Sequence, residues 1–297
     1  MHKGLQLIFL TALISGCSVF ANKIFVSATD PLVFTAVRNG VVVLILSALV
    51  LWRKQIPTFT GIKKSDWLRL LIIGFVGGGV AFGFFFTGLS QIGAVQGNVI
   101  HKTLFIWVAL LAVPWLGERF TKLQFVGLVL LLLATFVLGG PVAFAIKPGS
   151  FMVLTATLLW ALENVYSKQL LNRLSPLVVA WSRMAFGLPV LFFAVTIFGK
   201  GTQLFLPKTY LLLPLLSSSL LLTGYVLTWY YGLKVVPVTI ASGVLVIAPS
   251  ITLVLTGLLI THQFSFVQIL SVLTALGGAV LIARLTRSNR LLQIFKT

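Results

Sequence analysis

The chain repeats part of its own sequence once, at a spacing of 144 or 145 residues. The repeat shows at five places, each of which pairs a stretch of the first half with a stretch of the second half. These pairs are Leu10-Thr11-Ala12 with Leu154-Thr155-Ala156, Asp30-Pro31-Leu32-Val33 with Ser175-Pro176-Leu177-Val178, Arg38 with Arg183, Gly88-Leu89 with Gly232-Leu233, and Thr121 to Gln124 with Ser265 to Gln268. Chance would not hold one spacing over five places, and a repeat of this length decides the architecture.

Apolar segments make up most of both halves. The chain is 59% hydrophobic and 9% charged, whereas an average soluble domain is about 25% charged. Ten segments of roughly 20 apolar residues can each cross a hydrocarbon core of ~30 Å. They cover approximately residues 5–27, 32–52, 70–89, 95–116, 122–140, 150–171, 177–198, 210–232, 238–260 and 266–284. The sequence therefore predicts an all-α integral membrane protein with ten transmembrane helices.

The number of segments in each half sets how the halves insert. Five is odd, so the second half must enter the membrane upside down relative to the first. The expected units are a five-helix repeat over 1–140, an inverted five-helix repeat over 149–287, and a cytoplasmic tail over 288–297. This is the plan of secondary transporters, whose substrate site lies between the repeats near the bilayer midplane.

The basic residues predict the orientation. Lys and Arg total 22 against 4 Asp and Glu, and a net charge of +18 invites a nucleic-acid interpretation. However, 15 of these basic residues fall on the side of the N-terminus and 3 on the other, which is the loop asymmetry of a membrane protein. We expect cytoplasmic N- and C-termini, a lipid bilayer as surroundings, and no nucleic-acid partner.

A hairpin between two segments of the first half has a distinctive sequence. Leu116-Gly117-Glu118-Arg119-Phe120-Thr121 is followed by Gln124 and Gly127, and Thr121 with Gln124 has the spacing of a capping box that starts a helix. With ten spans and a proline turn leading to an arginine in each half, the chain resembles the drug/metabolite transporter superfamily, and the hairpin is similar to the signature of its EamA family. In the second half His262 stands at the family's glutamate and Ser271 at its glycine.

The resemblance implies a multi-pass carrier of the cell inner membrane for small polar metabolites, often an exporter of amino acids or related carboxylate-bearing compounds. Transport would proceed by alternating access, and both proton coupling and facilitated diffusion remain open, as do monomer and homodimer. The partners expected are a small-molecule substrate and, with coupling, protons. No cofactor, metal or catalytic residue is predicted.

Glu163 is the one acid placed well inside an apolar segment. Trp160, Tyr166 and Ser167 share its helical face, which gives a polar and aromatic stripe unsuited to lipid. Glu163 is interpreted as a proton site or as a counter-charge for an ammonium group. The alternative is a buried ion pair that fixes helix register, and we favour the functional interpretation.

Lys102 is the second candidate, about 10 Å from the nearer end of its segment and too deep to snorkel easily. It could bind a carboxylate or phosphate of the substrate, or pair with Glu163. Asn98 shares its face, and His101, which could be a hydrogen-bonded packing residue, points about 100° away. Asn22 belongs to a polar stripe of the first segment. The predicted substrate-binding residues are Lys102, Glu163, His101, Asn98, Trp160, Tyr166 and Asn22.

Other conspicuous residues favour structural roles. Arg38 and Arg183 obey the repeat, which favours scaffolding over substrate binding, whereas Glu163, His101 and Lys102 have no charged counterpart, which suits ligand recognition. Trp229-Tyr230-Tyr231 reads as an interfacial aromatic belt. Gly77-Gly78-Gly79 permits close helix packing or a bend.

The sequence also bears on two other classes of membrane protein. A membrane-embedded lipid-processing enzyme would need clustered carboxylates with a metal, or a nucleophile with a base. Four scattered acids and the single cysteine, Cys17, supply neither, and one cysteine also excludes an intramolecular disulfide. A non-transporting membrane scaffold or sensor is compatible with the same sequence.

Overall fold

The computed structural model describes residues 2–25, 30–55, 59–92, 94–119, 121–139, 147–205 and 212–294. These residues form helices and connections, with no strand among them. The first half contains α1 (His2–Phe25), α2 (Pro31–Trp52), α4 (Lys64–Ile73), the π-helix η2 (Gly74–Val80), α5 (Ala81–Ile92), α6 (Ala94–Lys102), α7 (Leu104–Leu116) and α8 (Lys122–Gly139). The second half contains α9 (Pro148–Leu170), α10 (Pro176–Ile197), the 3-10 helix η4 (Gly201–Phe205), α11 (Leu212–Val235), α12 (Val238–Val244), the 3-10 helix η6 (Leu245–Ile247), α13 (Ala248–Thr256), the π-helix η7 (Gly257–Thr261) and α14 (Phe266–Ile294).

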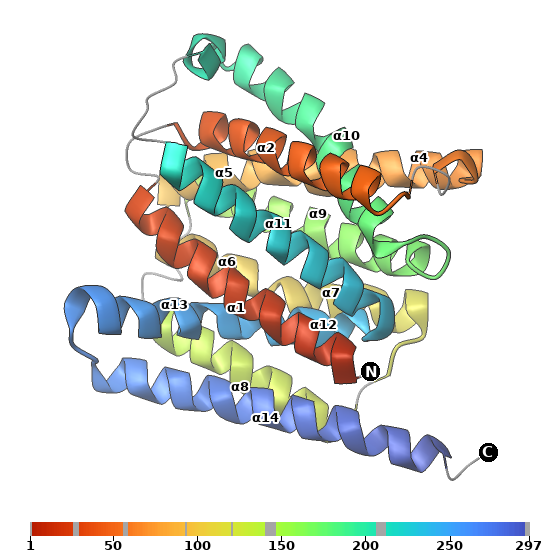
Figure 1. Ribbon diagram of the computed structural model, residues 1–297. Helices are drawn as coiled ribbons and strands as arrows, with labels where there is room; N and C mark the ends of the chain where they lie inside the picture. The colour runs from red at the N-terminus through yellow and green to blue at the C-terminus, as the bar shows by residue number, and fades with distance from the viewer. Residues whose placement is uncertain are drawn as a thin grey trace.

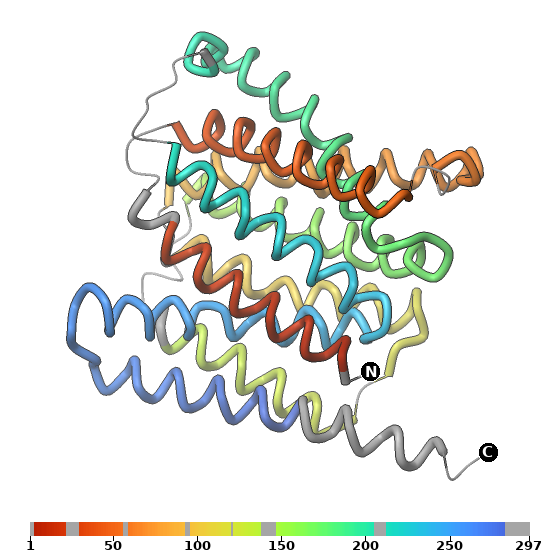
Figure 2. The backbone as a smooth tube through the Cα atoms, viewed as in Figure 1, coloured from red at the N-terminus to blue at the C-terminus, as the bar shows by residue number. Residues whose placement is uncertain are grey.

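Several of these elements join end to end into long helical segments that lie side by side (Figure 1). The backbone tube shows consecutive long segments running in alternate directions, so that α1 and α9, which begin the two halves, run oppositely (Figure 2). Among the described residues, seven helices are long and apolar enough to cross a membrane, and two shorter apolar ones cover Lys122–Val137 and Phe266–Ile282. Over the described residues, the structure therefore confirms the all-helical class and contains several helices able to span a membrane.

The two halves repeat their contacts as well as their helices. Asp30 caps the start of α2 by accepting the backbone N–H groups of Leu32 and Val33, and it pairs with Lys200 at 2.6 Å. Its counterpart Ser175 caps α10 by accepting the N–H of Val178. The Ser175 hydroxyl donates to Gln55 Oε1, and Gln55 precedes Lys200 by the same 145 residues. Each helix start is thus tied to the connection that follows the equivalent helix of the other half.

The predicted capping box is present in both halves. Thr121 and Gln124 exchange backbone-to-side-chain hydrogen bonds of 2.9 and 3.2 Å, and Ser265 and Gln268 do the same at 2.9 and 3.3 Å. In the turn before each capping box, the residue with left-handed backbone lies one position closer to the box in the second half than in the first. Both turns pass through the left-handed region, at Gly117 (φ 67°) and His262 (φ 51°). His262 therefore has the backbone role of the hairpin glycine.

Helices α8 and α14 pack on one another at one edge of the bundle (Figure 1). Gly127 and Gly278 meet there so closely that a Cβ on Gly278 would lie 2.6 Å from the Gly127 carbonyl oxygen. Ser271, which stands at the family's glycine position, instead donates its hydroxyl to the Ala134 carbonyl at 2.7 Å. The departure from glycine is therefore accommodated by a hydrogen bond.

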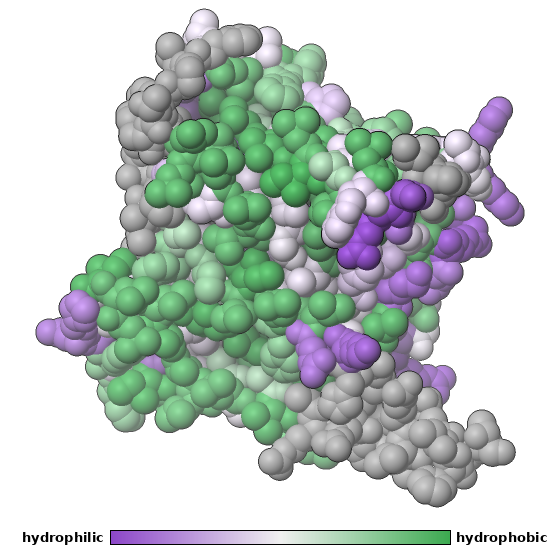
Figure 3. Space-filling model, in the orientation of Figure 1, coloured by the Kyte–Doolittle hydropathy of each residue, from purple (hydrophilic) through white to green (hydrophobic). Residues whose placement is uncertain are grey.

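The predicted segments 32–52 and 70–89 leave residues 53–69 as a connection, but this connection is shorter than expected because α4 already begins at Lys64. Asp66 is buried in the first turn of α4, 3.5 Å from Arg69 and 3.7 Å from Arg173, which follows α9. The acid stabilises a helix start and neutralises nearby cations, so the residues that looked like loop begin a helix. On the face shown in Figure 3, hydrophilic residues gather mainly at the right-hand end, with a smaller group at the lower left and a largely apolar surface between them.

Candidate functional site

Glu163 lies at the centre of a buried polar cluster on α9, with 2% of the residue exposed. The hydroxyls of Ser167 and Tyr230 each donate a 2.6 Å hydrogen bond to its Oε1. Oε2 accepts no hydrogen bond from the described residues but lies 3.7 Å from Nη2 of Arg183. One oxygen of the carboxylate is therefore satisfied, and the other faces a single cation.

The glycine run of η2 makes room for this carboxylate. A Cβ on Gly77 would collide with the Glu163 side chain, and one on Gly78 would collide with the backbone of α10 at Arg183. The Gly77 carbonyl accepts a hydrogen bond of 2.9 Å from Trp160 Nε1 and one of 3.5 Å from Arg183 Nη2. Close helix packing, one of the two roles predicted for this run, is therefore confirmed, and a π-helical turn accompanies it.

Aromatic rings form one wall beside the cluster. The His101 ring lies 4.9 Å from that of Trp160 and 5.2 Å from that of Phe85. Trp160 also packs edge-on against Phe82 at 5.3 Å. His101 Nδ1 is buried and has no hydrogen-bond partner among the described residues. The ring of His101 therefore has packing partners, while one nitrogen remains open to a ligand.

The two equivalent arginines converge on one ring. The guanidinium carbons of Arg38 and Arg183 lie 6.0 and 5.8 Å from the centroid of Phe82. Both arginines are buried. Arg183 binds the Gly77 carbonyl, as the scaffolding interpretation expects, and is also the ion-pair partner of Glu163. Arg38 hydrogen-bonds only its neighbour Asn39, at 3.4 Å, among the described side-chain acceptors.

Lys102 lies where the long helical segments of both halves are interrupted. A turn at Thr103 separates α6 from α7, and η6 interrupts α12 and α13 about 144 residues later. Nζ of Lys102 donates to the Leu245 carbonyl of η6 at 3.3 Å. Interrupted helices at membrane depth are where secondary transporters bind their substrates. Glu163 forms its ion pair with Arg183, and the Lys102–Glu163 pair that the sequence also allows is not formed among the described residues.

The remaining predicted residues are placed differently. Trp160 is part of the cluster, Asn98 is half-buried on α6, and the half-buried Tyr166 has its ring 6.5 Å from that of Trp115. The side chain of Asn22 falls outside the described residues. The structure therefore brings Glu163, Trp160 and His101 together, with Lys102 next to His101 in the chain.

Sequence reasoning missed Tyr230, and the aromatic-belt prediction is wrong for two of its three residues. Tyr230 and Trp229 are buried, and only Tyr231 is exposed. The Tyr230 hydroxyl binds Glu163, and Trp229 Nε1 donates to the Asn164 side-chain oxygen at 3.2 Å. Spacing along α11 could have given a hint, because Thr223, Val226, Trp229 and Tyr230 repeat every three or four residues on one buried face.

The buried charges do not balance. Among the described residues, three cations are buried in the body of the bundle with the single carboxylate of Glu163: Arg38, Arg183 and Lys102. The other buried acid, Asp66, is paired at the end of α9. Buried donors without a partner among the described residues include Asn39 Nδ2, Ser182 Oγ and Arg183 Nε. Asn39 follows Arg38 in the chain and Ser182 precedes Arg183, so all three donors lie on or beside the two arginines. Unpaired buried donors and cations are costly, and a bound anion would relieve that cost.

Two helical halves around a buried, charged centre define a membrane transporter with an internal repeat. The EamA-like transporter family model matches residues 2–140 and again residues 147–284. The chain therefore belongs to the EamA-like transporter family, which is consistent with the predicted drug/metabolite transporter superfamily. The family is one of transporters rather than enzymes.

Individual proteins give the same picture. A protein of Archaeoglobus fulgidus named uncharacterized transporter is 24% identical over 258 residues, which are 86% of this chain and 90% of that protein. A second protein of that name, from Methanothermobacter thermautotrophicus, is 28% identical over 149 residues, 48% of this chain and 43% of its own length. One solved crystal structure reaches a TM-score of 0.73 at 20% identity, covering 96% of this chain and 98% of that one, and this likeness shows the fold.

Proposed function

We propose that the protein is a secondary transporter that exports amino acids or related carboxylate-bearing metabolites by alternating access. In this proposal the ten helical segments of the described chain all cross the cell inner membrane, as two inverted five-helix repeats over 1–140 and 149–287 with a tail over 288–297. Both termini are cytoplasmic. This orientation rests on the asymmetric distribution of Lys and Arg.

The observation that carries the proposal is the surplus of buried cations. Arg38, Arg183 and Lys102 are buried, but of these three only Arg183 faces a carboxylate, that of Glu163, and several unpartnered donors among the described residues lie on or beside the arginines. Lys102 holds a single backbone carbonyl at 3.3 Å, a weak contact for a buried ammonium group. A substrate carboxylate would bind this lysine and Arg38 more strongly than their present acceptors do, because charge-assisted hydrogen bonds are stronger than neutral ones.

The free oxygen of Glu163 completes the site for a zwitterion. Oε2 accepts no hydrogen bond from the described residues, so it can accept one from a substrate ammonium group or carry a proton. The two uses exclude one another. A proton that arrives at the Glu163 carboxylate would therefore displace the substrate ammonium group, and an inward proton gradient would drive export by exchange.

The test is solute flux in proteoliposomes against a panel of amino acids, organic anions and organic cations. We expect saturable flux of carboxylate-bearing compounds and none of simple cations. Lys102→Met and Arg38→Met should each lower the ratio of maximal flux to half-saturating concentration by roughly tenfold or more, the loss of one charged hydrogen bond. Lys64→Met, at an exposed position of α4, is the matched control. Selective cation flux, or unchanged carboxylate flux in both variants, would overturn the proposal.

A further inference from the structure

Glu118 of the family hairpin reaches from the first half to the second. Its carboxylate accepts hydrogen bonds from the backbone N–H groups of Val238 and Thr239, at 2.7 and 3.0 Å, and from the Thr239 hydroxyl at 2.7 Å. Val238 and Thr239 are the first two residues of α12, where backbone N–H groups have no partner within the helix and favour a negative charge. Three charge-assisted bonds therefore join the α7–α8 connection to the start of α12.

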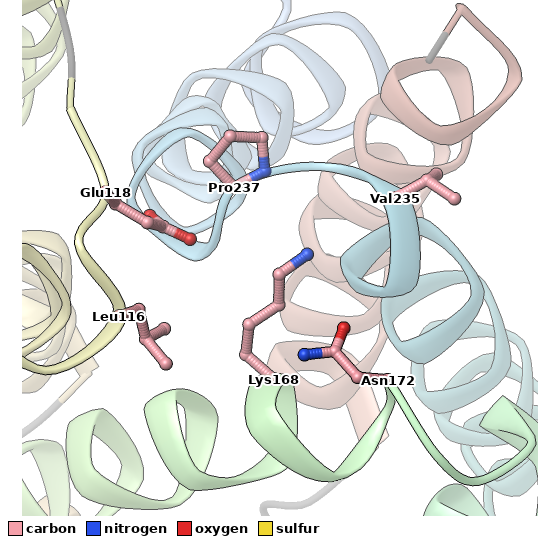
Figure 4. Close-up of a pocket in the computed structure, with 6 residues that line it drawn as sticks. All are labelled: Leu116, Glu118, Lys168, Asn172, Val235 and Pro237. Atoms are coloured by element: carbon pink, nitrogen blue, oxygen red, sulfur yellow. The ribbon is translucent and has the colours of Figure 1, made fainter.

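Lys168 holds the chain just before that point. Its ammonium group donates to the carbonyls of Leu233 and Val236 at 2.6 and 2.8 Å, and to that of Lys234 at 3.4 Å. These carbonyls lie at the end of α11 and just beyond it, where a cation is favoured. The connection from α11 to α12 thus runs between an anion and a cation. Figure 4 shows Glu118 and Lys168 on either side of Pro237, at a cavity of about 270 Å³.

A second contact joins α12 to this part of the first half. Lys102, at the end of α6, donates to the Leu245 carbonyl directly after the last residue of α12. Glu118 follows α7, which continues α6 after the turn at Thr103. Helix α12 is therefore held at its start by Glu118 and just past its end by Lys102. Lys102 lies within the fourth long segment of the first half and Glu118 lies directly after it, while α12 begins the fourth segment of the second half.

The repeat predicts a matching grip at the opposite end of the bundle, and the residues for it are missing. His262 and Gln263 follow the second-half segment in place of Glu118, and Val246 replaces Lys102. His262 and Gln263 are exposed, and neither side chain hydrogen-bonds the first half within the part of the chain that is described. Among the described residues, the two halves are therefore joined by more polar contacts at the Glu118 end than at the His262 end.

We propose that Glu118 and Lys102 form a clamp that holds α12 against the first half, and that the transporter opens at the Glu118 end only when this clamp releases. Among the described residues the opposite end has no equivalent clamp, so the substrate-free protein favours the state closed at the Glu118 end. In the proposed orientation that is the cytoplasmic end. The inference rests on the alternating access of the proposed function and does not depend on which substrate is carried.

Cysteine accessibility of the substrate-free protein in lipid nanodiscs tests the clamp. In a Cys17→Ser background, Ser242→Cys reports on α12 one turn beyond Thr239, where the native serine is 1% exposed. Asn98→Cys is its repeat-related counterpart, 144 residues earlier. We expect Glu118→Gln to speed maleimide labelling at Ser242→Cys by roughly tenfold or more and to slow it at Asn98→Cys, because opening one end closes the other. Gln263→Ala is the control at the opposite end and should change neither rate.

Two results would overturn the inference. Equal labelling at Ser242→Cys with and without Glu118→Gln would show that the carboxylate does not hold the end closed. A parallel rise at both reporters would show a loosened fold in place of a gate. Thr239→Val, which removes one of the three hydrogen bonds and keeps both backbone contacts, should give a smaller rise at Ser242→Cys alone. Since no substrate is added, the labelling result stands whether or not the flux panel supports carboxylate transport.

Discussion

Arg38 and Arg183 occupy equivalent positions in the two halves, and their surroundings differ. Both are buried and both lie over Phe82. Arg183 faces the carboxylate of Glu163, whereas Arg38 has the side-chain oxygen of Asn39. In the first half, valine or serine stands where the second half has Glu163. Both halves repeat the arginine, but only the second half has the acid. Arg183 therefore forms a neutral pair with Glu163, whereas Arg38 remains a cation without a carboxylate partner.

The same contrast recurs at the ends of the bundle. The start of α12 is bound by Glu118, while the exposed His262 and Gln263 make no such contact at the other end. Pairs that obey the repeat, such as Asp30 with Lys200 and Ser175 with Gln55, secure the helix starts. Glu163 and Glu118, which make these contacts in one half alone, have no acidic counterpart 144 or 145 residues away.

The largest expected difference between the halves is in stability. Arg183→Met leaves the buried Glu163 carboxylate without its cation. We expect the free energy of unfolding to fall by about 3–5 kcal/mol, which is the usual cost of breaking a buried ion pair. Arg38→Met removes a cation that has no carboxylate partner and should cost much less while lowering carboxylate flux. Thermal unfolding in detergent would give both values.

The double variant Arg183→Met with Glu163→Gln is the control, because it removes both charges. It should recover most of the stability lost in Arg183→Met. Equal destabilisation by Arg38→Met and Arg183→Met would contradict the contrast between a paired and an open arginine.

A smaller difference is expected at the helix starts, and it depends on pH. Burial alone would raise the pKa of Asp30, but the hydrogen bond from Lys200 and the N–H groups of Val33 and Leu32 together lower the pKa below the usual 3.8. The ionised carboxylate therefore stabilises the fold above pH 3.8, and this contribution is lost as the pH falls through the lowered pKa. Ser175, at the same place in the second half, does not titrate in this range.

Asp30→Ser gives α2 the capping residue that α10 has. We expect it to lower the free energy of unfolding by about 1 kcal/mol at neutral pH, since a serine still caps the helix and the part-exposed ion pair with Lys200 is weak. The difference from the unaltered protein should vanish as the pH falls below the lowered pKa. Unfolding followed between neutral and acidic pH checks this, with Ser175→Ala as the pH-independent comparison. If the difference in unfolding free energy persisted at low pH, the contribution of Asp30 to stability would not come from its charge.

Much of the fold could be predicted from the sequence because its determinants are local or periodic. The repeat spacing, the capping boxes at Thr121 and Ser265 and the glycine run of η2 all depend on residues close in the chain. A helical face also predicted that Glu163 and Trp160 belong together. These features required no knowledge of which distant segments meet.

The partners of the charged residues could not be predicted, because they come from other helices. Tyr230 lies 67 residues from Glu163 and looked like part of an interfacial belt. Arg183 was assigned to the scaffold because it obeys the repeat, although it also neutralises Glu163. Lys102 and Arg183 were both available as the cation, and only the crossing of η2 with α10 and α9 determines which one meets the carboxylate.

The most direct test of the account is proteoliposome flux of a transported amino acid under an imposed pH gradient, for the unaltered protein and Glu163→Gln. The account predicts flux that follows the gradient in the unaltered protein and loses that dependence in the variant, because glutamine cannot exchange a proton for the substrate ammonium group. Flux that ignores the gradient in both proteins would contradict it, and would leave Glu163 as a structural partner of Arg183 in a facilitator.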